Sequence, residues 1–171
     1  MFLNIIKKLI LKNKVSKLLP NLPVNQIDLI KSVGLIFDGN TTLDIETIKE
    51  ELLKYGIQEN QINVLIFKDM INEKEALKYD VFTYNDINWS GEITNLKAEL
   101  FLKTNFDLLI NYHDFEKIPL VYSSYLSKAN FKVGFASRDK IVNQFTINTS
   151  LNNHQLFIEE LFRYLKILNK I

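Results

Sequence analysis

The chain has 171 residues, of which 47% are hydrophobic and 24% are charged. This balance is typical of a folded globular protein and excludes a disordered one, and the length favours one domain with a core large enough to fold alone. The chain has no cysteine and only two histidines, which excludes a disulfide, a thiolate nucleophile and a cysteine-ligated metal. We therefore expect no metal site, no evident cofactor and a cytoplasmic location.

The formal net charge of +1 conceals an asymmetry along the chain. Residues 1–20 contain five lysines and no acidic residue, so subtracting these charges from +1 leaves −4 on residues 21–171. Nucleic acid recognition requires a basic surface on the folded domain. The mildly acidic remainder therefore argues against nucleic acid as the main partner.

Residues 2–19 have the pattern of a basic amphipathic helix, which Pro20 and Pro23 end. The lysines alternate with an apolar set, Leu3, Ile6, Leu9, Ile10 and Leu18. The segment is too charged to cross a bilayer and lacks the apolar core and cleavage site of a secretory signal. Two interpretations stay open: the helix attaches to an anionic surface such as the inner membrane, or it packs on the domain or on a second subunit of a homodimer.

After this segment, apolar runs typical of buried strands alternate with helical patterns. We divide the chain into an N-terminal helix with linker, residues 1–28, and a single α/β domain, residues 29–171. The predicted strands are 33–37, 62–67, 81–84, 106–110, 132–135 and a short sixth at 145–147, and the predicted helices are 42–55, 95–103, 119–127 and 155–168. Thr42 is the predicted N-cap of the first of these helices, and Gly56 is its C-terminal glycine.

Strands that alternate with helices imply right-handed crossovers and a parallel sheet covered on both faces. The predicted fold is a three-layer α/β sandwich with a mostly parallel, Rossmann-like or flavodoxin-like sheet. We expect the strand order 3-2-1-4-5, which the sixth strand could extend.

In this order the winding reverses between the first and fourth strands, and ligands of such sheets bind in the crevice at that point. The expected ligand-binding residues come from the two loops there: Asp38, Asn40, Thr41, Thr42, Asn111, His113 and Asp114. Free amides at the start of the first domain helix, with the threonine hydroxyls, could hold a small anion. Asp38 opposes an anion unless a cation or a ribose hydroxyl accompanies it. Turn chemistry alone explains Asp-Gly-Asn equally well.

Asp38 and His113 are the candidate catalytic residues, although neither belongs to a complete catalytic set. His113 is the better histidine for proton transfer because Asp114 follows it in the predicted crevice. A histidine beside an aspartate in a loop is nevertheless more often a solvated pair. Arg138, after the fifth strand and near Lys132, is a candidate anion clamp or a solvated turn residue.

The run Leu-Ile-Phe-Asp-Gly-Asn-Thr-Thr-Leu at residues 35–43 resembles the first motif of haloacid-dehalogenase-type phosphatases. The resemblance implies a nucleophile at Asp38 and, in this setting only, a magnesium cofactor. Asn40 stands where that family has a second aspartate, the general acid/base. A phosphatase activity would therefore lack its proton donor.

Two further resemblances concern larger parts of the chain. The Phe-Asp-Leu-Leu-Ile-Asn strand, the helix after it and the run Ser-Lys-Ala-Asn-Phe-Lys-Val-Gly-Phe are similar to part of the N-terminal domain of heptosyltransferase-like glycosyltransferases. Those enzymes need a second domain, for which this chain is too short. Over nearly its full length, the chain resembles an uncharacterised family of small bacterial proteins. The shared features are the basic helix, the Val-Gly-Leu-Ile-Phe-Asp strand and the closing Glu-Leu-Phe-Arg-Tyr-Leu helix, and they imply no activity.

The sequence therefore leaves the function unknown and favours a non-catalytic binding or adaptor domain with a small anionic ligand. The alternatives are an enzyme acting on a phosphorylated or nucleotide-sugar substrate, and a peripheral membrane-surface protein that attaches through residues 1–20.

Overall fold

A computed structural model of the protein describes residues 2–18, 29–71, 78–114, 116–136 and 142–171. Within these residues the strands are β1 (Val33–Asp38), β2 (Ile62–Phe67), β3 (Asp80–Phe82), β4 (Leu108–Tyr112), β5 (Phe131–Phe135) and β6 (Phe145–Ile147). The α-helices are α1 (Phe2–Leu18), α2 (Ile45–Lys54), α3 (Leu96–Lys103), α4 (Ile118–Leu126) and α5 (His154–Ile167), and two 3-10 turns are η2 (Glu59–Gln61) and η3 (Tyr84–Asp86).

The six strands form one parallel sheet in the order β3-β2-β1-β4-β5-β6. This confirms the predicted three-layer α/β fold, and β6 extends the predicted order next to β5. The central strands β1 and β4 are buried at every residue. Their near-continuous apolar sequences follow from this position, because helices cover a parallel sheet on both faces.

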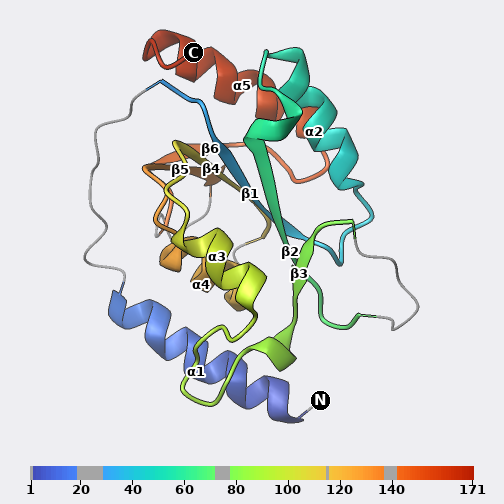
Figure 1. Cartoon of the computed structure of the whole chain (residues 1–171), viewed down its shortest axis with the longest axis vertical. Coiled ribbons are helices and arrows are strands. Elements are labelled where there is room, and N and C mark those ends of the chain that lie inside the picture. The colour runs from blue at the N-terminus through green and yellow to red at the C-terminus, as the bar shows by residue number, and fades with distance from the viewer. Residues whose placement is uncertain (1, 19–28, 72–77, 115, 137–141) are drawn as a thin grey trace.

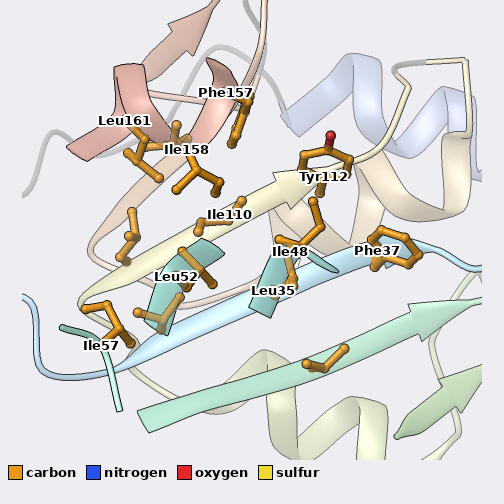
Figure 2. Close-up of a cluster of buried hydrophobic side chains, with 14 of the residues drawn as sticks. Leu35, Phe37, Ile48, Leu52, Ile57, Ile110, Tyr112, Phe157, Ile158 and Leu161 are labelled. Carbon is orange, nitrogen blue, oxygen red and sulfur yellow. The ribbon is translucent and has the colours of Figure 1, made fainter. Parts of the chain in front are cut away.

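Helices α2 and α5 cover one face of the sheet, and α1, α3 and α4 cover the other (Figure 1). Alternate residues of each strand point to opposite faces. Val33, Leu35 and Phe37 therefore belong to the core under α2 and α5, whereas Ile36 belongs to the other core. Figure 2 shows how side chains of β1, β4, α2 and α5 meet in the first core.

Helix α1 packs on the domain as an additional helix beside α4. Leu11 and Val15 are buried in the core that contains α3 and α4. Lys7 Nζ donates to the carbonyl oxygen of Tyr84 at 2.7 Å, and Lys14 Nζ lies 5.9 Å from the ring centre of Tyr122. None of the helices in the described ranges is long and apolar enough to cross a membrane. The predicted domain boundary at residue 28 lies outside the described residues and stays a prediction.

Four predicted boundaries differ from the structure by two or more residues, and local side-chain caps explain two of them. Helix α2 begins at Ile45, because Asp44 and not Thr42 is its N-cap: the Asp44 side chain accepts from the backbone N–H of Glu46. Strand β4 begins two residues later and ends two residues later than predicted, so Asn111 and Tyr112 are strand residues. Strand β3 ends at Phe82, since Thr83 caps the turn η3.

Gly56 follows the C-cap of α2 with a φ of 89°, a conformation that glycine adopts at no steric cost. The predicted C-terminal glycine of this helix is therefore confirmed.

Candidate functional site

Asp38 ends β1, and its carboxylate organises the loop that follows. The residue is 5% exposed. Its Oδ1 accepts from the backbone N–H of Asn40 at 3.0 Å and from Asn40 Nδ2 at 2.7 Å. Asn40 Oδ1 accepts in turn from the backbone N–H of Asp69, just after β2. These contacts join the ends of β1 and β2. Asp38 and Asn40 therefore stabilise a turn, which is one of the two interpretations that the sequence allows for them.

A lysine at the start of α4 lies near the Asp38 carboxylate. Lys117 Nζ lies 3.9 Å from Asp38 Oδ2 and 3.3 Å from Asp69 Oδ2. Lys117 therefore joins the β1 and β2 ends to α4, across the switch point between β1 and β4. Sequence reasoning missed this residue, because 79 positions separate Lys117 from Asp38 and no local pattern marks the pair.

The arrangement around Asp38 does not fit magnesium. A magnesium ion takes oxygen ligands in an octahedral arrangement, whereas an ammonium group contacts both carboxylates here. In the parts of the chain that the structure describes, no three His, Asp or Glu side chains are placed to hold a metal ion.

Asn111 on the neighbouring strand β4 and His113, which directly follows that strand, both point beneath α4. They are two residues apart, so strand alternation places them on the same face. His113 is 1% exposed; its Nδ1 lies 3.1 Å from the carbonyl oxygen of Asp114, and its Nε2 lies 3.1 Å from Ser124 Oγ. The Ser124 hydroxyl also contacts Asn111 Oδ1 at 2.7 Å, and Asn111 Nδ2 donates to Asn143 Oδ1 at 2.6 Å. We call Asn111, His113, Ser124 and Asn143 the polar cluster.

Burial sets the protonation of His113. Removal from water lowers the pKa of its imidazole to about 4, although the hydrogen bond to Asp114 and the charges of Asp38 and Asp114 act in the opposite direction. At neutral pH the ring is therefore uncharged. Because the Asp114 carbonyl only accepts, the proton lies on Nδ1 and Nε2 faces the hydroxyl of Ser124.

Lys132 is a further buried polar residue under α4. Its Nζ donates to the carbonyl oxygens of Ser124 at 2.7 Å and Ser127 at 2.6 Å. Burial lowers the pKa of this lysine to about 8. Lys132 thus binds the carbonyl end of α4, where the helix dipole favours a cation. Arg138, the candidate anion clamp, lies outside the described residues, and its role stays a prediction.

The two predicted loops line two different clefts. The first cleft, of about 270 Å³, lies at the carboxyl ends of β1 and β2, and its walls include Gly39, Asp44, Lys68, Lys78 and Tyr79. The second cleft, of about 240 Å³, is lined by His113, Asp114, Phe135, Thr149, Ser150 and Leu151.

Thr41 and Thr42 are exposed and precede Asp44, the residue that caps α2. Their hydroxyls are therefore not at the first free amides of that helix. The roles of Asp38, Asn40, Thr41, Thr42, Asn111, His113 and Asp114 in ligand binding stay predictions.

The fold and these clefts define a three-layer α/β protein of the Rossmann-like type. A family model described as "Family of unknown function (DUF6913)" matches residues 7–168. The match covers almost the whole chain, so the protein belongs to this family, and the full-length resemblance to an uncharacterised family is confirmed. No curated protein and no solved structure gave a match. The phosphatase and glycosyltransferase resemblances stay predictions.

Proposed function

We propose that the protein is a non-catalytic binding domain that takes a small anion in the first cleft. The observation that carries the proposal is the position of this cleft: it opens at the carboxyl ends of two parallel strands, where α/β proteins bind their ligands, and two lysines stand in its wall. Lys68 and Lys78 are the cations among the lining residues, and Asp44 is the carboxylate. Lys78 is paired with Glu46, so an anion in the cleft would share Lys78 with that carboxylate.

The wall that carries Lys78 is held rigidly against α2. Lys78 Nζ lies 2.7 Å from Glu46 Oε1, and the hydroxyl of Tyr79 donates to the same carboxylate. Buried Lys49 contacts both the Tyr79 hydroxyl and Glu59 at 3.0 Å. Hydrogen bonds from Lys78 and Tyr79 lower the pKa of Glu46. A preformed wall of this kind spares a ligand the entropic cost of ordering it.

The size of the cleft limits the ligand. Sites for drug-sized molecules enclose roughly 300–1,000 Å³, and this cleft has about 270 Å³. A phosphate or carboxylate carried by a small sugar or acid fits this volume better than a dinucleotide. Phe37, Leu43 and Ile66 provide an apolar side for the carbon frame of such a molecule.

The state of the two candidate catalytic residues supports binding over catalysis. Both Asp38 and His113 are buried and engaged in hydrogen bonds with the loop and with α4. For proton transfer, a side chain must come within about 3 Å of a substrate atom or of one bridging water. With exposures of 5% for Asp38 and 1% for His113, neither side chain offers a substrate much surface. The protein would act in the bacterial cytoplasm, in keeping with its lack of cysteine.

Thermal unfolding in the presence of small anions tests the proposal. Inorganic phosphate, pyrophosphate, sugar phosphates and nucleotides are the probes. A ligand at 100 times its Kd adds about 2.7 kcal/mol of stability, which corresponds to a rise in Tm of about 5–10 °C for a domain of this size.

The variant Lys78→Ala should remove most of this rise. Lys97→Ala is the matched control, because Lys97 is an equally exposed lysine that forms one ion pair, with Asp80, away from the first cleft. If none of the probes shifts Tm, or if both variants lose the shift equally, the cleft is not an anion site.

A hydrolysis assay with a phosphoester substrate and magnesium distinguishes a binding function from the enzymatic alternative. Hydrolysis that Asp38→Asn abolishes would make the protein a phosphatase and overturn the non-catalytic assignment. We expect no turnover in either protein.

A further inference from the structure

Helix α1 is fixed to the domain by contacts along one side. Besides the burial of Leu11 and Val15, the turn at Gly91 accommodates the helix closely: a Cβ at Gly91 would lie 3.2 Å from Ile10 Cγ2 and from the Lys14 side chain, and its φ is +76°. Lys7 reaches the carbonyl of Tyr84 and lies 5.7 Å from the ring centre of Trp89. The helix is therefore part of the folded surface and presents a defined outer side.

The first turns of that outer side are apolar. Leu3, Ile5 and Leu9 are 55%, 52% and 59% exposed, and Trp89 beside the helix is 56% exposed. At 100° per residue, the directions of Leu9 and buried Leu11 differ by about 160° around the helix axis. The apolar residues of the first turns, Leu3, Ile5, Ile6, Leu9 and Ile10, span an arc of about 160° on this basis. A helix that only packed on the domain would have polar residues over this arc throughout, as the later turns do at Asn13, Ser16 and Lys17.

Lysines border the arc on both sides. Lys8 and exposed Lys12 lie along one edge, and Lys7 and Lys14 lie along the other. Helix α1 contains five lysines and no acidic residue. An apolar surface bordered by lysines, with a tryptophan at its edge, is the pattern of helices that lie in the plane of an anionic lipid interface.

We propose that the outer face of α1, together with Trp89, binds an anionic membrane surface. The charge of the helix selects this occupant over a second copy of the chain, because a symmetric contact would bring two sets of five lysines together. It also selects lipid over nucleic acid, since three large apolar side chains occupy the centre of the face. This inference is independent of the anion cleft, which lies on the opposite side of the sheet, against α2.

Co-sedimentation with vesicles tests the proposal. The protein should pellet with vesicles of phosphatidylcholine and phosphatidylserine (about 7:3) and not with phosphatidylcholine alone, and 0.5 M salt should release it. Each lysine near an anionic surface contributes about 1 kcal/mol. The double change Lys8→Gln and Lys12→Gln should therefore weaken binding by about 25-fold, whereas Lys97→Gln and Lys103→Gln on α3 should leave it unchanged.

A second pair of variants tests the apolar contribution. Ile5→Gln with Leu9→Gln should reduce binding at least tenfold. Leu96→Gln with Leu100→Gln is the matched control, since these leucines are 67% and 58% exposed at the same spacing on α3. Circular dichroism confirms that each variant folds.

Three results would overturn the proposal. They are equal binding to neutral vesicles, an equal loss of binding in the α1 double variant and in its α3 control, and failure of the wild type to pellet. A concentration-dependent dimer that Ile5→Gln with Leu9→Gln dissociates, without vesicle binding, would assign the face to self-association instead.

Discussion

Ser124 Oγ lies 3.1 Å from the Nε2 atom of His113, and this contact joins α4 to the end of β4 beneath the helix. Ser124 is fully buried and the imidazole is 1% exposed. A serine hydroxyl at a histidine nitrogen is also the first element of a nucleophilic dyad. Here both groups are enclosed, and the hydroxyl also contacts Asn111 Oδ1 and the Leu120 carbonyl. The contact therefore positions α4 on the sheet.

The first prediction concerns this hydroxyl. Ser124→Ala removes the group that Asn111 Oδ1 and His113 Nε2 face, and a buried polar group that loses its partner costs about 1–3 kcal/mol. We expect this loss in the free energy of unfolding, measured with urea. Ser123→Ala is the control: Ser123 is also fully buried, but its hydroxyl bonds only to Pro119 of its own helix, at 2.9 Å. Equal losses in the two variants would mean that the polar cluster contributes no specific stability.

The second prediction is an acid sensitivity caused by His113. Its pKa is about 4 in the folded protein and about 6.5 in the unfolded chain. Between these values the unfolded state binds the extra proton, so stability falls as the pH falls. From pH 7 to pH 4.5 this one group should cost about 2 kcal/mol.

Urea unfolding of wild type and His113→Gln at both pH values measures the effect. The stability advantage of the wild type over the variant should shrink by this amount on acidification. The variant His154→Gln retains His113, so its free energy of unfolding should still fall on acidification by the amount that His113 causes. An imidazole of His113 that titrates above pH 6 by NMR would contradict the buried, neutral state.

The third prediction concerns Gly134 in β5. A Cβ at this position would lie 2.4 Å from Asn143 Nδ2 and 3.2 Å from the Asn111 carbonyl oxygen. Gly134→Ala should therefore destabilise the protein by about 1–3 kcal/mol through overpacking. In the double variant with Asn143→Ala, the nearest obstruction is absent. The double variant should therefore lose less stability than the sum of the losses of the two single variants. Strict additivity in a double-mutant cycle would show that the clash is with the backbone and not with the amide.

The order of the sheet was predictable because each element carries its own signal. β1 and β4 have the continuous apolar runs of strands covered on both faces, and α5 keeps its apolar residues at spacings of three and four. Winding rules then leave few arrangements of these elements. The ends of the elements were less predictable: Asn111 reads as a loop residue by polarity, yet burial beneath α4 keeps it in the strand.

The polar contacts of the site depend on residues far apart in the chain. Asn111 meets Asn143 across 32 positions, and Lys117 meets Asp69 across 48. No local spacing marks such pairs. One signal was present: Asn111 and His113 differ by two positions, so strand alternation places them on one face. Ser124 of α4 contacts both from above that face.

The sequence pattern predicts one apolar side for helix α1, and this description is incomplete. Its buried contacts come from Leu11 and Val15, whereas Leu3 and Leu9 from the predicted apolar set lie outside. The helix has apolar residues on the side that packs against α4 and, in its first turns, also on the side that faces solvent. A periodicity argument assigns a single apolar side, and only the packing of the helix separates the two.

The last prediction concerns Lys132, whose ammonium group binds the carbonyl end of α4. Lys132→Met keeps the apolar stem and removes the donors to Ser124 and Ser127, so we expect a loss of about 2–4 kcal/mol at pH 7. Lys128→Met, an exposed lysine two residues after α4, should have little effect.

The pH dependence of the Lys132 variant has a defined sign. The pKa of Lys132 is about 8 in the folded protein and about 10.4 in the unfolded chain, so between these values the unfolded state holds more protons and stability rises with pH. The difference in unfolding free energy between wild type and Lys132→Met should grow by about 2 kcal/mol from pH 8 to pH 10. A difference that shrinks over this range would mean that the folded protein stabilises the charged form, and that the carbonyls of α4 more than offset the burial of the ammonium group.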